Sequence, residues 1–256
     1  MPITSNNGVK IYYEIEGKGP PVIFQTGAAG DMNMWREAGY IENLDGFRKI
    51  LVDHRGHGRS DKPAALAQHR MENYVDDVLA VMGALGIERS AFIGYSDGGR
   101  VGFELAASHP DRIACLVSIG SVGLMNDEVY EARKSLADSI RAIGMQYLID
   151  LYENDGDLFP EWLRGQSLST DKEMIALELT GWKDWPGVWD RLAEIKVPVM
   201  IIVGEKEDPE DLAGKAEKLL QNGRRLTFPN HDHIGNFLAL ENFLSDLVEF
   251  ISTNTP

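Results

Sequence analysis

The sequence has a single cysteine, Cys115, among its 256 residues. One thiol cannot form an intramolecular disulfide, and it cannot supply the several thiolates of a zinc–sulfur site. Cys115 stands inside an apolar stretch, where a small hydrophobic side chain packs well and burial suppresses thiolate formation. We therefore expect Cys115 to belong to the core, and a reducing compartment is compatible with this cysteine content.

Basic residues are also scarce, with 25 Lys and Arg against 40 Asp and Glu and a formal net charge of −15. Without a basic block, neither nucleic acid nor an anionic membrane surface is an expected partner. No stretch approaches the roughly 18 apolar residues of a membrane span, and the first residues do not resemble a signal peptide. We expect a cytoplasmic protein, a monomer or homodimer, that acts on a small and preferably neutral molecule.

Repeats, low-complexity tracts and Pro/Ser-rich linkers are absent as well, so hydrophobic periodicity has to indicate the order of elements. Short, nearly continuous apolar runs predict buried parallel strands, and the stretches between them have helical spacing. This alternation predicts an α/β fold with a three-layer, mostly parallel sheet flanked by helices. The predicted strands follow an early hairpin at 9–15 and cover 21–24, 49–52, 91–94, 115–119, 197–203 and 226–228, and the predicted helices include 74–85, 101–107, 212–220 and 237–251.

The interval from about Val122 to Leu192 breaks this pattern, because it has helix-like stretches and tryptophans but no convincing core strand. Predicted sheet strands stand on both sides of it, so it resembles an insertion more than a terminal interaction module. We predict an α/β core formed by residues 1–121 and 193–256, and a small helical cap, 122–192, inserted after the sixth strand.

Ser96 stands in the motif GYSDGG (94–99), between the apolar run 91–94 and a stretch of helical spacing. A serine raised on a sharp strand-to-helix turn needs small neighbours, because the strained backbone and the passing helix leave little room. Gly94 and Gly98 meet that need. The free N–H groups at the start of a helix also stabilise negative charge. The motif predicts Ser96 as a nucleophile; the alternative is a glycine-rich turn with an idle serine.

From this motif outward, the chain resembles the α/β-hydrolase fold superfamily, in its esterase-like serine hydrolase branch. The segment DHRGHGRS (53–60) is similar to the loop that these proteins carry after their fourth strand, and PDRI (110–113) to their lead-in to the sixth. The resemblance gives His54 and His57 a structural role. It implies a Ser-His-Asp triad and no cofactor. Relatives that act on epoxides or halogenated compounds have Asp where this chain has Ser96.

A serine hydroxyl is a weak nucleophile unless a neighbouring base accepts its proton, and histidine suits that role at neutral pH. Two histidines, His231 and His233, stand in the late segment NHDHIG. The resemblance favours His233, because the superfamily places its histidine just before an apolar residue and the last helix. A metal site of His231, Asp232 and His233 is the alternative; since no further ligands cluster there, we expect no metal.

The imidazole needs a carboxylate that fixes its tautomer and stabilises the imidazolium. In the superfamily this acid lies between the serine and the histidine, so the predicted strand ending at Gly204 points to Glu205, Glu207 and Asp208. The usual spacing from the glycine matches Glu207, whereas the proline after Asp208 matches the superfamily's common Asp-Pro pair. We predict Asp208 as the triad acid and keep Glu207 as the alternative; one of them could simply cap a helix.

A tetrahedral oxyanion needs two preorganised N–H donors. The resemblance implies the backbone N–H groups of Asp97, which follows the nucleophile, and of Ala28 in TGAAG (26–30). The superfamily commonly has His-Gly where this chain has Thr26 and Gly27, which changes a side chain near the site but not the main-chain donor. TGAAG lacks the Gly-Lys-Ser/Thr ending of a phosphate loop, so no nucleotide is expected.

Four further side chains are predicted to contact the substrate. Tyr95 adjoins the nucleophile, Met32 follows the oxyanion loop, and Trp182 and Trp185 stand in the predicted cap. The tryptophans could equally hold the cap together by packing, and Met32 could pack the first helix.

The sequence therefore predicts hydrolysis of a small carboxylic ester or lactone through an acyl-enzyme on Ser96. The same triad geometry also serves C–C bond hydrolases and cofactor-free perhydrolases, and the fold alone does not choose among them. A non-catalytic receptor that holds a small ligand in the cap pocket is the alternative from another functional class.

Overall fold

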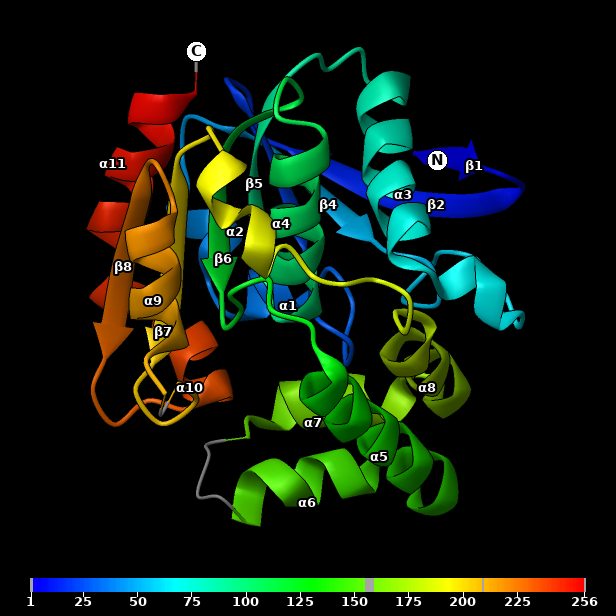
Figure 1. The fold of residues 1–256 in the computed structure, drawn as a ribbon. Helices are drawn as coiled ribbons and strands as arrows, with labels where there is room; N and C mark the ends of the chain where they lie inside the picture. The colour runs from blue at the N-terminus through cyan, green and yellow to red at the C-terminus, as the bar shows by residue number, and fades with distance from the viewer. Residues whose placement is uncertain (1, 155–158, 209, 256) are drawn as a thin grey trace.

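One eight-stranded sheet organises the chain in the computed structural model, which describes residues 2–154, 159–208 and 210–255. The strand order is β1-β2-β4-β3-β5-β6-β7-β8; β1–β2 and β2–β4 are antiparallel, and every other neighbouring pair is parallel (Figure 1). The predicted α/β fold is confirmed. The strands are β1 (Ile3–Asn6), β2 (Val9–Glu16), β3 (Pro21–Gln25), β4 (Arg48–Asp53), β5 (Ser90–Tyr95), β6 (Ile113–Ile119), β7 (Val199–Gly204) and β8 (Gly223–Phe228).

The central strands β5, β6 and β7 are buried at every position, as their continuous apolar runs predicted. Cys115 on β6 is fully buried, and burial raises the pKa of its thiol to about 12. One face of the sheet packs against α3 (Met71–Ala84), α4 (Asp97–Ser108) and α9 (Leu212–Leu219). The other packs against α1 (Met34–Glu37), α2 (Tyr40–Asn43), α10 (His233–Leu238) and α11 (Leu244–Asn254).

Among the described residues, four helices, which we call the cap helices, lie between β6 and β7, and Figure 1 shows them together beyond the carboxyl ends of the parallel strands. An apolar cluster that includes Ile140, Leu148 and Ile175 joins the first, second and fourth of these helices and contacts Ala28 in the loop after β3. Ligands of open α/β sheets bind at this end of the strands. The helices are α5 (Asp127–Ile143), α6 (Gln146–Asn154), α7 (Glu161–Ser169) and α8 (Lys172–Gly181), and a 3₁₀ turn, η2 (Trp189–Glu194), precedes β7.

The predicted single helix over 237–251 is wrong, because the structure has α10 and α11 separated by the 3₁₀ turn η3 (Leu240–Asn242). The hydroxyl of Tyr40 donates a hydrogen bond to the carbonyl of Phe237, which therefore does not simply continue a helical ladder. The N–H of Asn242 then bonds three residues back, to Ala239, so the chain tightens and turns. Within the described part of the chain, no helix combines the length and apolarity needed to cross a bilayer.

Candidate active site

Ser96 lies at the turn from β5 into α4, with φ 55° and ψ −116°. This is a strained conformation for a residue with a side chain. Main-chain bonds hold it: the Ser96 N–H donates to the carbonyl of Ile119 at 2.8 Å, and its carbonyl accepts from the N–H of Arg100 at 3.2 Å. A Cβ on Gly94 or Gly98 would collide with backbone atoms, so both positions need glycine. The turn holds the hydroxyl at the carboxyl end of the sheet.

His233 begins α10, and its Nε2 lies 3.0 Å from the Oγ of Ser96. Tyr95 positions the imidazole: the two rings stack with centroids 4.9 Å apart, and the Tyr95 hydroxyl donates to the carbonyl of His233 at 3.3 Å. His231 lies elsewhere, with Nδ1 placed 2.9 Å from the carbonyl oxygen of Pro229. Of the two late histidines, the structure therefore brings His233 to the serine.

Glu207, and not Asp208, contacts the imidazole, with its Oε2 2.5 Å from Nδ1 of His233. Its other oxygen accepts from the N–H of Gly204 at 2.8 Å and from Nδ2 of Asn236 at 3.2 Å. The carboxylate is thus fixed from both sides.

The preference for Asp208 as the triad acid is corrected by this geometry. Asp208 turns toward α9, where its two oxygens accept from the N–H groups of Leu212 and Ala213 at 2.7 and 2.8 Å. It satisfies free donors in the first turn of that helix, which is the capping role considered for one of the two acids.

Gly120 is a site residue that the sequence analysis missed. It follows β6 with φ +68°, and a Cβ there would lie 2.7 Å from Cε1 of His233 and 3.2 Å from Oε2 of Glu207. Any side chain would therefore push the imidazole or the carboxylate out of place. Asn236 was missed too; it is fully buried and anchors Glu207 to β7 through a second bond, 3.0 Å long, to the carbonyl of Ile202.

Both predicted oxyanion donors, Ala28 and Asp97, line the cavity beside Ser96. Asp97 is the first residue of α4, where main-chain N–H groups have no partner within the helix. Gly27 allows the loop to approach, since a Cβ there would lie only 2.7 Å from Cβ of Ser96. The carbonyl of Ala28 lies 2.8 Å from Nε2 of His57, which ties the loop to the segment after β4.

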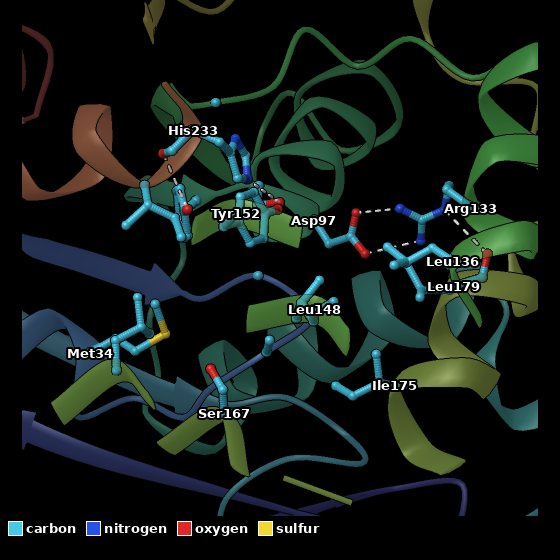
Figure 2. A pocket seen from close by; sticks show the side chains of 18 of the residues that line it. Met34, Asp97, Arg133, Leu136, Leu148, Tyr152, Ser167, Ile175, Leu179 and His233 are labelled. Atoms are coloured by element: carbon cyan, nitrogen blue, oxygen red, sulfur yellow. Dashed lines mark hydrogen bonds and ion pairs between the residues drawn. The ribbon is translucent and has the colours of Figure 1, made fainter. Parts of the chain in front are cut away.

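A cavity of about 360 Å³ opens between this site and the cap helices. Figure 2 shows its wall, where aliphatic side chains of the cap face Tyr152, His233 and the Asp97–Arg133 pair. The cap contributes mostly apolar side chains, so the cavity suits a small substrate with an apolar part. Its lining includes Ala28, Met34, Tyr95, Arg100, Arg133, Leu136, Ile140, Leu148, Tyr152, Leu163, Ile175 and Leu179.

Tyr95 is the one predicted substrate contact that lines this cavity; the placement of the other three is corrected. Met32 borders a separate polar pocket, and Met34, two residues further along the chain, lines the cavity instead. Trp182 is fully buried, with its ring 5.5 Å from that of Tyr74.

Trp185 is buried as well, and its Nε1 donates to Glu104 on α4 at 2.8 Å. Trp182 and Trp185 both belong to the core cluster on the α4 side of the sheet. Their role is therefore packing, as the alternative had it, but they pack into the core of the sheet and not within the cap.

A second group of ionisable side chains, His54, His57 and Glu178, is fully buried away from the cavity. Nε2 of His54 and of His57 lie 3.3 and 3.4 Å from Oε2 of Glu178. Burial lowers the pKa of His54 to about 3 and that of His57 to about 4, and it raises the pKa of Glu178 to about 8. These donor types could hold a metal ion, but at neutral pH they also form a neutral network, with Glu178 protonated.

Comparison with known proteins agrees with this architecture. Residues 20–143 match the family model for the alpha/beta hydrolase fold. The structure of an enol-lactonase from Burkholderia xenovorans LB400 superposes with a TM-score of 0.83 at 26% identity, covering 98% of this chain and 99% of the other. The chain has the α/β-hydrolase fold, and these matches support its membership of the α/β-hydrolase superfamily.

Curated relatives are similar over almost the whole chain, as two examples show. A bifunctional esterase/perhydrolase from Acinetobacter calcoaceticus is 26% identical, over 97% of this chain and 98% of its own. A non-heme chloroperoxidase from Streptomyces lividans is 28% identical, over 90% of this chain and 92% of its own. These similarities and the fold support a hydrolase of the ester or lactone type.

Proposed function

We propose that this α/β-hydrolase cleaves a small carboxylic ester or lactone through an acyl-enzyme on Ser96. The observation that carries the proposal is the continuous chain of contacts from Ser96 Oγ to His233 Nε2, and from His233 Nδ1 to Glu207 Oε2. This arrangement has the nucleophile, base and orienting acid of a serine hydrolase, with Glu207 in the place of the expected Asp.

In the first half-reaction, His233 Nε2 accepts the hydroxyl proton as Ser96 Oγ attacks the carbonyl carbon. Glu207 holds the Nδ1 proton and stabilises the imidazolium. The tetrahedral oxyanion is stabilised by the main-chain N–H groups of Ala28 and Asp97. As the intermediate collapses, the C–O bond to the alcohol breaks, and His233 gives its proton to the departing alkoxide.

The second half-reaction uses the same groups. His233 accepts a proton from water, whose oxygen attacks the acyl-enzyme carbonyl, and the C–O bond to Ser96 then breaks as His233 returns the proton to Oγ. The products are a carboxylic acid and an alcohol, or one hydroxy acid from a lactone. None of these steps needs a metal or an organic cofactor.

Turnover by a Ser96→Ala variant tests the proposal, with short aliphatic esters and lactones as substrates. We expect kcat to fall by at least about 10³-fold, the scale of loss when a triad nucleophile is removed. Ser135→Ala is the matched control, because Ser135 is exposed on α5 and should leave turnover unchanged.

Two results would reject the proposal. Equal turnover by the pure Ser96→Ala and wild-type proteins would exclude Ser96 as the nucleophile. A ligand that the wild-type protein binds tightly and releases unchanged, together with no turnover of any ester or lactone, would support the receptor alternative.

A further inference from the structure

Two arginines line the cavity next to the nucleophile, although the chain as a whole is strongly acidic. Arg100 lies one turn after Ser96 on α4, and Arg133 comes from the cap helix α5. The side chain of Arg133 is 9% exposed and that of Arg100 is 21% exposed. Both guanidiniums meet the same carboxylate, that of Asp97, which is itself buried.

Every guanidinium nitrogen of Arg133 has a hydrogen-bond partner in the protein. Its Nη1 and Nη2 donate to the two oxygens of Asp97 at 2.6 and 3.0 Å, as Figure 2 shows. Its Nε donates to the carbonyl of Leu179 at 3.2 Å, and Nη2 also reaches the carbonyl of Glu178. The guanidinium in addition packs 4.6 Å from the ring centre of Trp182. Arg133 therefore balances the charge of Asp97 and fixes the cap to the catalytic turn.

Arg100 is not saturated. Its Nη1 donates to Asp97 at 2.9 Å, to an oxygen that already accepts from Arg133. Its Nε is buried and has no hydrogen-bond partner among the described residues. A buried donor without an acceptor is unfavourable, and a guanidinium offers donors in the geometry that a carboxylate accepts.

Neither of the two nearby glutamates, Glu207 and Glu178, supplies the missing acceptor. Glu207 is engaged by His233, Gly204 and Asn236. Glu178 faces His54 and His57, where burial raises its pKa to about 8, so it is protonated at neutral pH. Around Asp97, one carboxylate thus meets two guanidiniums.

Arg100 is also well placed relative to the reacting atoms. Arg100 lies in the first turn of α4, which starts directly after Ser96, and both residues line the same cavity. A carboxylate a few carbons away from the attacked carbonyl would reach the guanidinium while the carbonyl stays at Ser96.

We propose that Arg100 binds a carboxylate of the substrate, so that the enzyme prefers a monoester or lactone of a dicarboxylic acid to a neutral ester. This inference rests on the proposed function and refines its substrate class. It also revises the expectation of a neutral substrate, which followed from the net charge of −15. Net charge averages over the surface, whereas the local field in a cavity depends on the groups that line it.

The test compares monoethyl adipate with ethyl hexanoate, which have six-carbon acyl chains and differ in one terminal carboxylate. Ethanol release gives kcat/KM for each ester. We expect the wild-type protein to favour monoethyl adipate. Arg100→Gln should lower the ratio of the two kcat/KM values by about 10- to 100-fold, the range for losing hydrogen bonds to a charged group. Arg100→Lys should restore part of it, because the charge remains.

Arg70→Gln is the matched control, since Arg70 is exposed on the surface at the start of α3 and its loss changes the net charge equally. Its ratio should stay at the wild-type value. The inference is overturned if the wild-type protein shows no preference for the anionic ester, or if Arg100→Gln leaves the ratio unchanged.

A binding measurement separates this inference from the proposed function. Titration calorimetry of monoethyl adipate into Ser96→Ala protein should show binding that weakens at least tenfold in the Ser96→Ala/Arg100→Gln double variant. If no ester is hydrolysed but this difference is found, the proposed reaction is wrong and the carboxylate site stands. If esters are hydrolysed through Ser96 and the two variants bind equally, the reaction stands and the carboxylate site is wrong.

Discussion

Among the described residues, two groups place histidine beside a glutamate, and they differ in how far solvent and substrate can reach them. His233 and Glu207 lie 2.5 Å apart on the wall of a cavity, with side chains 20% and 12% exposed. His54 and Glu178 lie 3.3 Å apart, with both side chains 1% exposed. The same chemical groups can therefore exchange protons with a substrate in the first place and are sealed inside the protein in the second.

The partners of each group explain the difference. Nε2 of His233 lies next to the Ser96 hydroxyl, so it can accept the proton that the serine loses. The imidazoles of His54 and His57 meet each other and Glu178, with ring centres 3.8 Å apart. Burial keeps these two histidines neutral, so they connect α8 of the cap to the segment after β4 without carrying charge. Residue type alone does not distinguish the two groups; burial and partners do.

The largest expected effect comes from removing the charge of Glu207. Glu207→Gln should lower kcat by about 10³- to 10⁴-fold, because the imidazole loses the group that fixes its tautomer and stabilises its cation. Asp208→Asn is the matched control and should change kcat by less than about threefold, since Asp208 caps α9. Steady-state ester hydrolysis measures both. A larger loss in Asp208→Asn than in Glu207→Gln would restore Asp208 as the triad acid.

A smaller effect on kcat is expected when His233 and Glu207 are both retained but displaced. Gly120→Ala places a Cβ within 2.7 Å of the His233 ring at a backbone φ that disfavours side chains. We expect kcat to fall by about 10- to 100-fold, the scale of an ångström-sized misplacement. Gly83→Ala on α3 is the control, because its Cβ would meet nothing within 4 Å. Equal kcat values for the two folded variants would show that Gly120 does not constrain the pair.

The smallest effect concerns the buried group of His54, His57 and Glu178. It should change the stability of the fold and not the rate of catalysis. The pKa of Glu178 is raised to about 8 by burial, so between about pH 5 and 8 the unfolded chain has lost this proton and the folded chain keeps it. The wild-type free energy of unfolding should therefore fall with rising pH, relative to Glu178→Gln, by up to about 1.4 kcal/mol per pH unit.

Urea unfolding of both proteins at several pH values in this range measures the difference, and ester hydrolysis should be similar in the two. If the free energies of unfolding of the two proteins changed with pH in the same way, Glu178 would not keep its proton in the folded state. If Glu178→Gln lost as much kcat as Glu207→Gln, Glu178 would have a catalytic role and not a structural one.

The parts of the site that the sequence predicted are those set by short-range pattern. The turn around Ser96 depends on Gly94 and Gly98, which stand two residues before and after it. A short sequence motif is therefore enough to predict this turn. The buried strands β5 and β6 are continuous apolar runs, so their existence was predictable as well.

The parts that the sequence did not predict depend on contacts between distant segments. The choice of Glu207 over Asp208 follows from the path of the loop after β7, where Gly204 and Asn236 hold one acid while α9 takes the other. The burial of Trp182 depends on how α8 meets the core. The unpartnered Nε of Arg100 becomes visible only once the structure shows Asp97 paired with Arg133, which comes from another helix.

The most direct test of the central claim, that His233 activates Ser96, is the rate at which a fluorophosphonate labels the serine in two histidine variants. His231→Ala should react as fast as the wild-type protein, because His231 lies against Pro229. His233→Ala should react at least about 10³-fold more slowly, with intact mass and peptide mapping placing the label of the wild-type protein on Ser96. Equal labelling rates for the two variants, or a label on a different residue, would contradict the account.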